Sequence, residues 1–122
     1  MTVLIDSYAW FEYFFGSQRG KAVEKAIESD ERIVVSQINL IEVYAKYLKT
    51  APSEAEEKIR FVQSRSEVID VDREISLKAA KLKVGKGLGS ADAIILATAQ
   101  KESAVLLTGD KHFKEFNNVK MI

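Results

Sequence analysis

The sequence predicts an α/β fold, a three-layer α/β/α sandwich around a mostly parallel sheet of four to five strands. Two observations carry this prediction. Short runs of apolar, often β-branched residues recur along the chain, and helical segments separate them. These runs are apolar at consecutive positions, as in strands that helices cover on both faces. We expect a single domain over residues 1–122, because this length supplies one core and no repeat or linker divides the chain.

The expected strands cover residues 2–5, 32–35, 67–71, 104–108 and 118–122. The first helix is expected over residues 8–15, where Gly16 ends it, and the second over about residues 20–28. Ser53 and Glu56 form a capping-box pattern that starts a helix ending near Ser66. Four residues stand at predicted N-cap positions, where a side-chain oxygen accepts an amide hydrogen of the first turn: Ser7, Ser36, Asp72 and Ser90.

Composition excludes several kinds of chemistry. The chain has no cysteine, which excludes disulfides, thiolate-bound zinc and a thiol nucleophile and suits a cytoplasmic location. Its one histidine, His112, excludes acid–base catalysis by a histidine pair. Eighteen basic and eighteen acidic side chains cancel, so no strong overall field attracts nucleic acid. No apolar run approaches the length of a membrane span, so we expect no membrane contact.

Carboxylates are the abundant reactive groups that remain, and three of them are expected at one edge of the sheet. Asp6 follows the first strand directly, and Asp110 follows the fourth strand after a short turn. Asp92 lies near the start of an apolar helix, whose N-terminus a right-handed crossover brings to the same edge. Ligands bind at the carboxyl ends of parallel strands, where the strand order reverses. The three acids therefore predict a functional crevice.

Each acid also has an ordinary structural explanation. Asp92 alone fits a first-turn acid that the helix dipole favours, and Asp110 fits a turn residue beside a glycine. A capping role for Asp6 or Asp92 is weakened, because Ser7 and Ser90 already stand at the cap positions.

Glu42 is the fourth candidate, since it interrupts an apolar run in the second turn of its helix. Its ordinary explanation is a surface glutamate. Three other acids compete with these four. Asp72 is explained as a helix cap and Glu12 as part of a solvent-facing surface, whereas Asp70, at the end of the third strand, has no such explanation.

Carboxylates that converge on one crevice repel each other unless protons or a cation neutralise them. Oxygen ligands without cysteine or several histidines suit Mg²⁺ or Mn²⁺, which bind phosphate oxygens as further ligands. Such an ion can activate water for attack on a phosphodiester and stabilise the leaving oxygen. The acids therefore indicate nuclease or phosphatase chemistry.

Four motifs carry a family resemblance: LIDSYAW with Asp6, SQINLIEVYAK with Glu42, GLGSADAIILATA with Asp92 and LLTGDKHF with Asp110. Together they resemble a PIN domain, and are most similar to the VapC-type toxins of toxin–antitoxin pairs. The resemblance covers essentially the whole chain, with the motifs in the family's order and approximate spacing. It implies a PIN-like fold and a Mg²⁺- or Mn²⁺-dependent endoribonuclease.

The resemblance also implies roles for individual residues. The catalytic set is Asp6, Glu42, Asp92 and Asp110, of which the three aspartates hold the metal. Ser7 and Thr108 support this set, Thr108 as the family's small hydroxyl residue beside the last acid. Lys111 and His112 stand where some relatives carry a further acid, so a complete second metal site is not implied.

The partners implied by the resemblance are an RNA substrate, a cognate VapB-type antitoxin inserted into the acidic groove, and a second copy of the chain. The aromatic residues between positions 8 and 15 are too dense for one helix core, so some should be exposed unless they form a partner or dimer surface.

Two other functions fit parts of the sequence. A phosphoacceptor receiver-like signalling domain of flavodoxin-like topology fits the size and the acid after the first strand, and would use Asp70 as acceptor. Against it, the chain lacks an adjacent acidic pair after that strand. A catalytically inactive PIN-like module that binds RNA or protein is the second alternative.

Overall fold

A computed structural model describes all 122 residues. Its five strands are β1 (Thr2–Ile5), β2 (Arg32–Ser36), β3 (Glu67–Ile69), β4 (Ala104–Thr108) and β5 (Val119–Met121). They form one sheet in the order β3-β2-β1-β4-β5, in which every neighbouring pair is parallel. The predicted sheet is thus confirmed, with five strands and no antiparallel pair.

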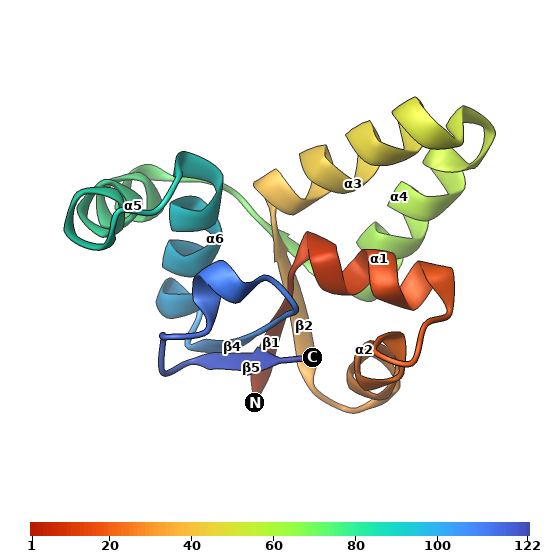
Figure 1. Cartoon of the computed structure of the whole chain (residues 1–122), viewed down its shortest axis with the longest axis horizontal. Coiled ribbons are helices and arrows are strands. Elements are labelled where there is room, and N and C mark those ends of the chain that lie inside the picture. Colours follow the sequence, from red (N-terminus) through yellow and green to blue (C-terminus); the bar gives the residue numbers. More distant parts are fainter.

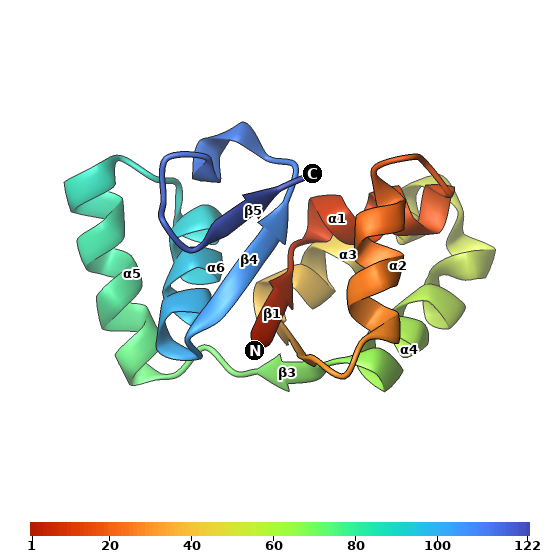
Figure 2. The same ribbon diagram turned by 90° about the horizontal axis from the view of Figure 1, so that it is seen from below.

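Six helices flank this sheet: α1 (Ser7–Phe15), α2 (Gly20–Glu28), α3 (Gln37–Thr50), α4 (Ala55–Arg65), α5 (Arg73–Lys86) and α6 (Ser90–Lys101). Two short 3-10 turns, η1 (Pro52–Glu54) and η2 (Lys111–Phe113), complete the chain. Figures 1 and 2 show α1 to α4 on one side of the sheet and α5 with α6 on the other. This is the three-layer sandwich that the sequence predicts.

The strands are apolar at consecutive positions because helices cover both faces of the sheet. Val3 and Ile5 belong to a core cluster with Trp10 of α1, on the α1–α4 side. Leu4, between them in β1, belongs to a separate cluster with Leu96 of α6. Successive residues of one strand therefore pack in different core clusters on opposite faces of the sheet. Neither face is exposed, so no position in the strand favours a polar residue.

The order of the strands places a reversal between β1 and β4. The chain runs outward from β1 through β2 to β3, and then crosses back to add β4 and β5 on the other side of β1. The register pairs Leu4 with Leu106 and Ile5 with Leu107, so β1 and β4 end at the same edge. Parallel sheets bind ligands in the crevice outside such a reversal.

Two of the four predicted caps are wrong. Helix α1 begins at Ser7 and helix α6 at Ser90, so the N-cap positions belong to Asp6 and Gly89. The side chain of Asp6 does not cap α1, and Gly89 has no side chain that could cap α6. The hydroxyl of Ser7 instead donates to Glu42, and that of Ser90 accepts from Lys83, so tertiary contacts take both groups away from the helix ends.

The other two caps are confirmed. Asp72 accepts the amide hydrogen of Ile75, and Ser36 takes part in a capping box with Asn39. The pattern at Ser53 and Glu56 forms no box, because η1 precedes α4, whose N-cap makes no side-chain bond.

The aromatic residues of α1 pack mainly within the chain. Trp10 is fully buried and stacks with Phe14 at 5.9 Å between ring centroids. Tyr13 stacks with Phe61 of α4 at 5.7 Å, whereas Phe15 is 62% exposed. This cluster joins α1 to α4, and only Phe15 is largely exposed. None of the six helices combines the length and apolar character that crossing a membrane requires.

Candidate active site

All four predicted acids line one cavity of about 210 Å³ at the carboxyl edge of the sheet. They come from four different elements: Asp6 follows β1, Glu42 lies in α3, Asp92 in the first turn of α6, and Asp110 after β4. The remaining lining residues are Ser7, Tyr8, Phe11 and Ile95. Segments up to 104 residues apart in sequence thus contribute carboxylates to one space.

Asp6 is the most deeply buried of the acids, with 5% of its surface exposed. Its backbone amide donates to the carbonyl of Leu107 at 3.0 Å, which ties the end of β1 to β4. Burial raises the pKa of Asp6 to about 6, and the charges of Glu42 and Asp110 act in the same direction. The hydrogen bond from Thr108 opposes this rise in pKa. This carboxylate therefore binds a proton or a cation more readily than an exposed aspartate does.

Thr108, the last residue of β4, is fully buried beside Asp6. Its hydroxyl donates to Oδ2 of Asp6 at 2.7 Å and accepts the amide hydrogen of Asp110 at 3.0 Å. One hydroxyl therefore contacts the acid of β1 and shapes the turn that carries the acid of β4.

Glu42 is held by a buried polar network from α1 and α3. The hydroxyl of Ser7 donates to Oε1 of Glu42 at 2.7 Å. The side-chain amide of Asn39 donates to the hydroxyl of Ser7 at 3.0 Å and to Oδ1 of Asp6 at 3.3 Å. Burial raises the pKa of Glu42, and the negative charges of Asp92 and Asp110 add to the rise.

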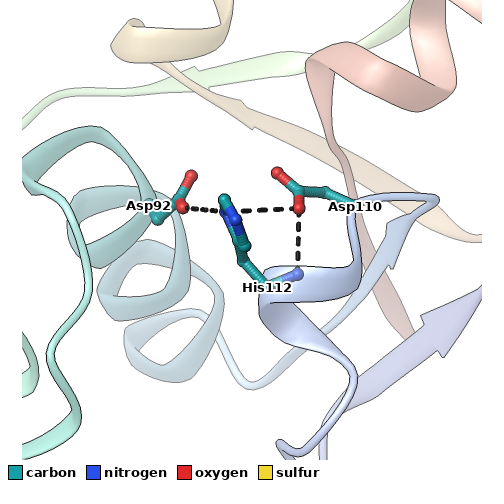
Figure 3. Close-up of side chains that lie close together, drawn as sticks. All are labelled: Asp92, Asp110 and His112. Carbon is teal, nitrogen blue, oxygen red and sulfur yellow. Dashed lines mark hydrogen bonds and ion pairs between the residues drawn. The ribbon is translucent and has the colours of Figure 1, made fainter.

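Asp92 and Asp110 face each other across the imidazole of His112 (Figure 3). The Nδ1 atom of His112 lies 3.0 Å from Oδ2 of Asp92 and 3.4 Å from Oδ1 of Asp110. The backbone amide of His112 also donates to Oδ1 of Asp110 at 2.9 Å. The hydrogen bond to Asp92 is the main cause of a raised pKa for His112, so the imidazolium is favoured here.

The competing acids lie outside this cavity. Asp70 is exposed after the edge strand β3, and Asp72 caps α5 and pairs with Lys101. Glu12 does not line the cavity; it accepts a hydrogen bond from the hydroxyl of Ser17 and is half-buried, so it is not simply solvent-facing. The strand order also differs from the 2-1-3-4-5 order of flavodoxin-like receivers. A receiver using Asp70 is therefore not supported.

The residues present fit a divalent metal ion. Four carboxylates around one small cavity are a hard oxygen donor set, which suits Mg²⁺ and Mn²⁺. The raised pKa values of Asp6 and Glu42 come mainly from burial, with a smaller contribution from neighbouring carboxylates, so both charges are poorly solvated without a cation. One ligand atom from each of Asp92, Asp110 and His112 lies within 4.8 Å of the others, within reach of a single ion.

The family model of the PIN domain matches residues 3–119. The chain belongs to the PIN domain family. The resemblance carried by the four motifs is thereby confirmed, and it places the acidic cavity in a family whose members generally use divalent metal ions. No curated protein sequence matches the chain at a significant level.

Solved structures share this PIN fold over nearly the whole chain. A chain of a toxin–antitoxin complex from Klebsiella pneumoniae is 26% identical, with 98% of this chain and 96% of that chain covered and a TM-score of 0.83. A chain of VapBC2 from Rickettsia felis, bound to a DNA fragment from its promoter, is 22% identical. The match covers 100% of this chain and 98% of that chain, with a TM-score of 0.78.

A third similar structure is VapC20 from Mycobacterium tuberculosis, described as a toxin that cleaves the sarcin–ricin loop. It is 16% identical, with 93% of each chain covered and a TM-score of 0.74. The fold predicted from the sequence is thus that of structures in the VapBC group.

Sequence reasoning missed two residues of the site, Asn39 and Tyr8, and treated His112 only as a departure from the family pattern. Asn39 is fully buried, and its side-chain amide donates hydrogen bonds to Asp6 and Ser7. Its spacing of three residues from Glu42 places both on one helix face and was the available signal. Tyr8 lines the cavity from the first turn of α1, and nothing local distinguishes it from the other aromatic residues of that helix. The contact of His112 with Asp92 depends on how η2 lies against α6, which no local pattern encodes.

Proposed function

We propose that residues 1–122 act as a single-domain, divalent-metal-dependent endoribonuclease, the toxin of a VapBC-type toxin–antitoxin pair in the cytoplasm. The observation that carries the proposal is the convergence of Asp6, Glu42, Asp92 and Asp110 on one small cavity at the carboxyl edge of the sheet. The PIN family membership and the similarity to toxin–antitoxin structures support the same conclusion.

In this proposal Asp6, Asp92 and Asp110 hold the metal. When bound, a Mg²⁺ or Mn²⁺ ion neutralises the carboxylates, polarises the scissile phosphate and makes a neighbouring water more acidic. Thr108 keeps the carboxylate of Asp6 in place, and the turn that begins at Thr108 positions Asp110.

Glu42 is proposed to orient the attacking water. The hydroxyl of Ser7 donates a hydrogen bond to Oε1 of Glu42. No protein group donates a hydrogen bond to Oε2, so that oxygen is left to accept a proton from water. The raised pKa of Glu42 brings its proton affinity closer to neutral pH, which favours this role.

The deciding experiment is cleavage of total RNA by the purified, antitoxin-free protein with Mg²⁺ or Mn²⁺, and with EDTA as control. Asp92→Asn should lower the cleavage rate by roughly tenfold to a hundredfold, because it weakens a metal ligand. Asp70→Asn is the matched control, since Asp70 is an exposed acid outside the cavity and its loss should leave the rate unchanged.

Two outcomes would overturn the proposal. Equal cleavage by the wild type and Asp92→Asn at saturating metal would remove this site from catalysis. A folded protein that binds metal and RNA but cleaves no RNA would instead be the inactive PIN-like binding module.

We also propose a VapB-type antitoxin as partner. The complexes from Klebsiella pneumoniae and Rickettsia felis support this, as does the acidic cavity, whose four carboxylates attract a cationic side chain as well as a metal. Induced expression in a bacterial host should arrest growth, and co-expression of the antitoxin should restore it. Growth arrest that the antitoxin does not relieve would contradict the pairing.

A homodimer is the third part of the proposal. Its support is an apolar groove of about 370 Å³ on α3 and α4, in which Ile41 and Leu48 are 63% and 48% exposed. Burying such residues against a second copy removes apolar surface from water. Sedimentation should show a dimer for the wild type and a monomer for Ile41→Lys, whereas an unchanged mass would place the interface elsewhere.

A further inference from the structure

His112 lies between two of the proposed metal ligands and comes from a third position in the chain. Its Nδ1 atom is 3.0 Å from Oδ2 of Asp92 and 3.4 Å from Oδ1 of Asp110 (Figure 3). The three side chains belong to α6, to the end of β4 and to η2. The imidazole is thus placed where it either pairs with the carboxylates or shares a cation with them.

These separations match neighbouring ligands around one metal ion. In octahedral coordination with bonds of about 2.1 Å, donor atoms at adjacent positions are about 3 Å apart. The two distances from Nδ1 of His112 are close to that value, and all three donor atoms lie within 4.8 Å of one another. Small side-chain movements are enough to bring one ion into contact with all three.

The backbone around His112 is held in place by its neighbours. The amide of His112 donates to Oδ1 of Asp110 at 2.9 Å. The next residue, Phe113, is fully buried in the core cluster that contains Ile95 and Leu96 of α6, the helix that carries Asp92. The base of the imidazole is therefore fixed relative to both carboxylates before any ligand binds.

We propose that His112 is a ligand of the ion that Asp92 and Asp110 hold, and that its nitrogen makes the site prefer Mn²⁺ over Mg²⁺. The inference rests on the proposed metal-dependent function. The neutral imidazole binds through the lone pair of Nδ1 and keeps its proton on Nε2, while the proton of Nδ1 goes to solvent. Imidazole nitrogen binds first-row transition metals such as Mn²⁺ better than Mg²⁺, which is suited to oxygen ligands.

The competing interpretation is an ion pair in which the imidazolium neutralises the two carboxylates and must be displaced by the metal. The two interpretations predict opposite changes in metal affinity when the imidazole is removed. Removing a ligand weakens metal binding, whereas removing a competing cation strengthens it for both metals alike.

The first test is pulsed EPR of Mn²⁺ bound to the 122-residue chain without a histidine tag. Because His112 is the only histidine in the chain, hyperfine coupling to an imidazole nitrogen can come from no other residue. We expect this coupling in the wild type and its loss in His112→Phe, which keeps an aromatic ring without a nitrogen. Bound Mn²⁺ without imidazole coupling in the wild type would overturn the inference.

The second test compares the affinities of Mn²⁺ and Mg²⁺ by calorimetry. His112→Phe should weaken Mn²⁺ binding by at least roughly tenfold and Mg²⁺ binding by no more than about threefold. His112→Gln offers an oxygen in place of the nitrogen, and should retain Mg²⁺ binding while losing the preference for Mn²⁺. Lys111→Ala is the control, because it removes an adjacent exposed cation and should leave the ratio of the two affinities unchanged.

The outcomes separate this inference from the proposed function. No binding of either metal to the folded wild type would contradict the metal-dependent nuclease itself. Binding of both metals with the same ratio in the wild type and His112→Phe would leave the nuclease intact and exclude His112 as a ligand. Tighter binding of both metals by His112→Phe would establish the ion pair instead.

Discussion

The hydroxyl of Thr108 donates a 2.7 Å hydrogen bond to Oδ2 of Asp6, although 102 residues separate the two in sequence. Both residues are buried, and the same hydroxyl accepts the amide hydrogen of Asp110. The bond therefore links the acid after β1 to the turn that carries the acid after β4.

Thr108→Val should weaken both stability and catalysis. Valine keeps the shape of threonine but removes the donor to Asp6 and the acceptor for the Asp110 amide, which costs about 1–3 kcal/mol of unfolding free energy. Denaturant unfolding in EDTA measures this cost, and RNA cleavage measures the effect on the site. Thr108→Ser retains the hydroxyl and should stay close to the wild type in both. Equal behaviour of the valine and serine variants would show that the hydroxyl is dispensable.

Asp6 should make the metal-free protein less stable as pH rises. Its pKa is about 6 in the folded state against 3.8 as the ordinary value, so between these pH values the folded state holds a proton that the unfolded state has lost. The contribution of Asp6 to the free energy of unfolding therefore falls as pH rises from about 4 to about 6, by about 3 kcal/mol in all.

The measurement compares the wild type with Asp6→Asn by denaturant unfolding in EDTA at several pH values. Titratable groups that do not interact with Asp6 cancel in the difference. Asp6→Asn should gain stability relative to the wild type as pH rises through this window, and then keep a constant difference above it. Parallel curves would contradict a raised pKa for Asp6.

Asn39→Ala should destabilise the protein, because Asn39 is fully buried and bonds three groups. Its amide nitrogen donates to Asp6 and Ser7, and its oxygen accepts from the backbone of Ser36. We expect a loss of about 2–3 kcal/mol in unfolding free energy, together with slower RNA cleavage. The exposed Asn117→Ala is the control, and a matching loss there would mean that the buried network is not the cause.

Gly109→Ala should disturb the site through Tyr8. A Cβ atom at position 109 would lie 2.2 Å from a ring carbon of Tyr8, so the ring must move, and its 2.7 Å bond to Arg19 is then lost. We expect a cost of about 1–3 kcal/mol in unfolding free energy and reduced cleavage.

A double-mutant cycle identifies the cause. In the Tyr8→Ala background the same Gly109→Ala change should cost far less, because no ring remains to be displaced. Additive losses would show that the clash with Tyr8 is not responsible.

The sequence predicted the fold well where local signals agree with the tertiary structure. The bounds of β1, β4 and α2 match their predicted ranges, and Gly16 ends α1 with a φ of 69° that favours glycine. The edge strands β3 and β5 are shorter than predicted, because each pairs with only one neighbour and over three residue positions.

The position of the four acids was predictable from the topology of a parallel sheet, because Asp6 and Asp110 each follow a strand. Their hydrogen-bond partners were not. Ser7 has the local signature of a helix cap, but in the fold it donates to Glu42, 35 residues away. Asn39 likewise depends on the approach of α3 to α1, which no local pattern encodes.

The reversal of strand order between β1 and β4 also governs when the site can exist during synthesis. Asp6 is synthesised 102 residues before Thr108, and Asp110 and the β5 strand that pairs with β4 follow later still. A nascent chain in which α1 to α4 have already folded still lacks one wall of the cavity. The cavity therefore cannot assemble, and its carboxylates cannot act together, until the chain has been synthesised past Asp110.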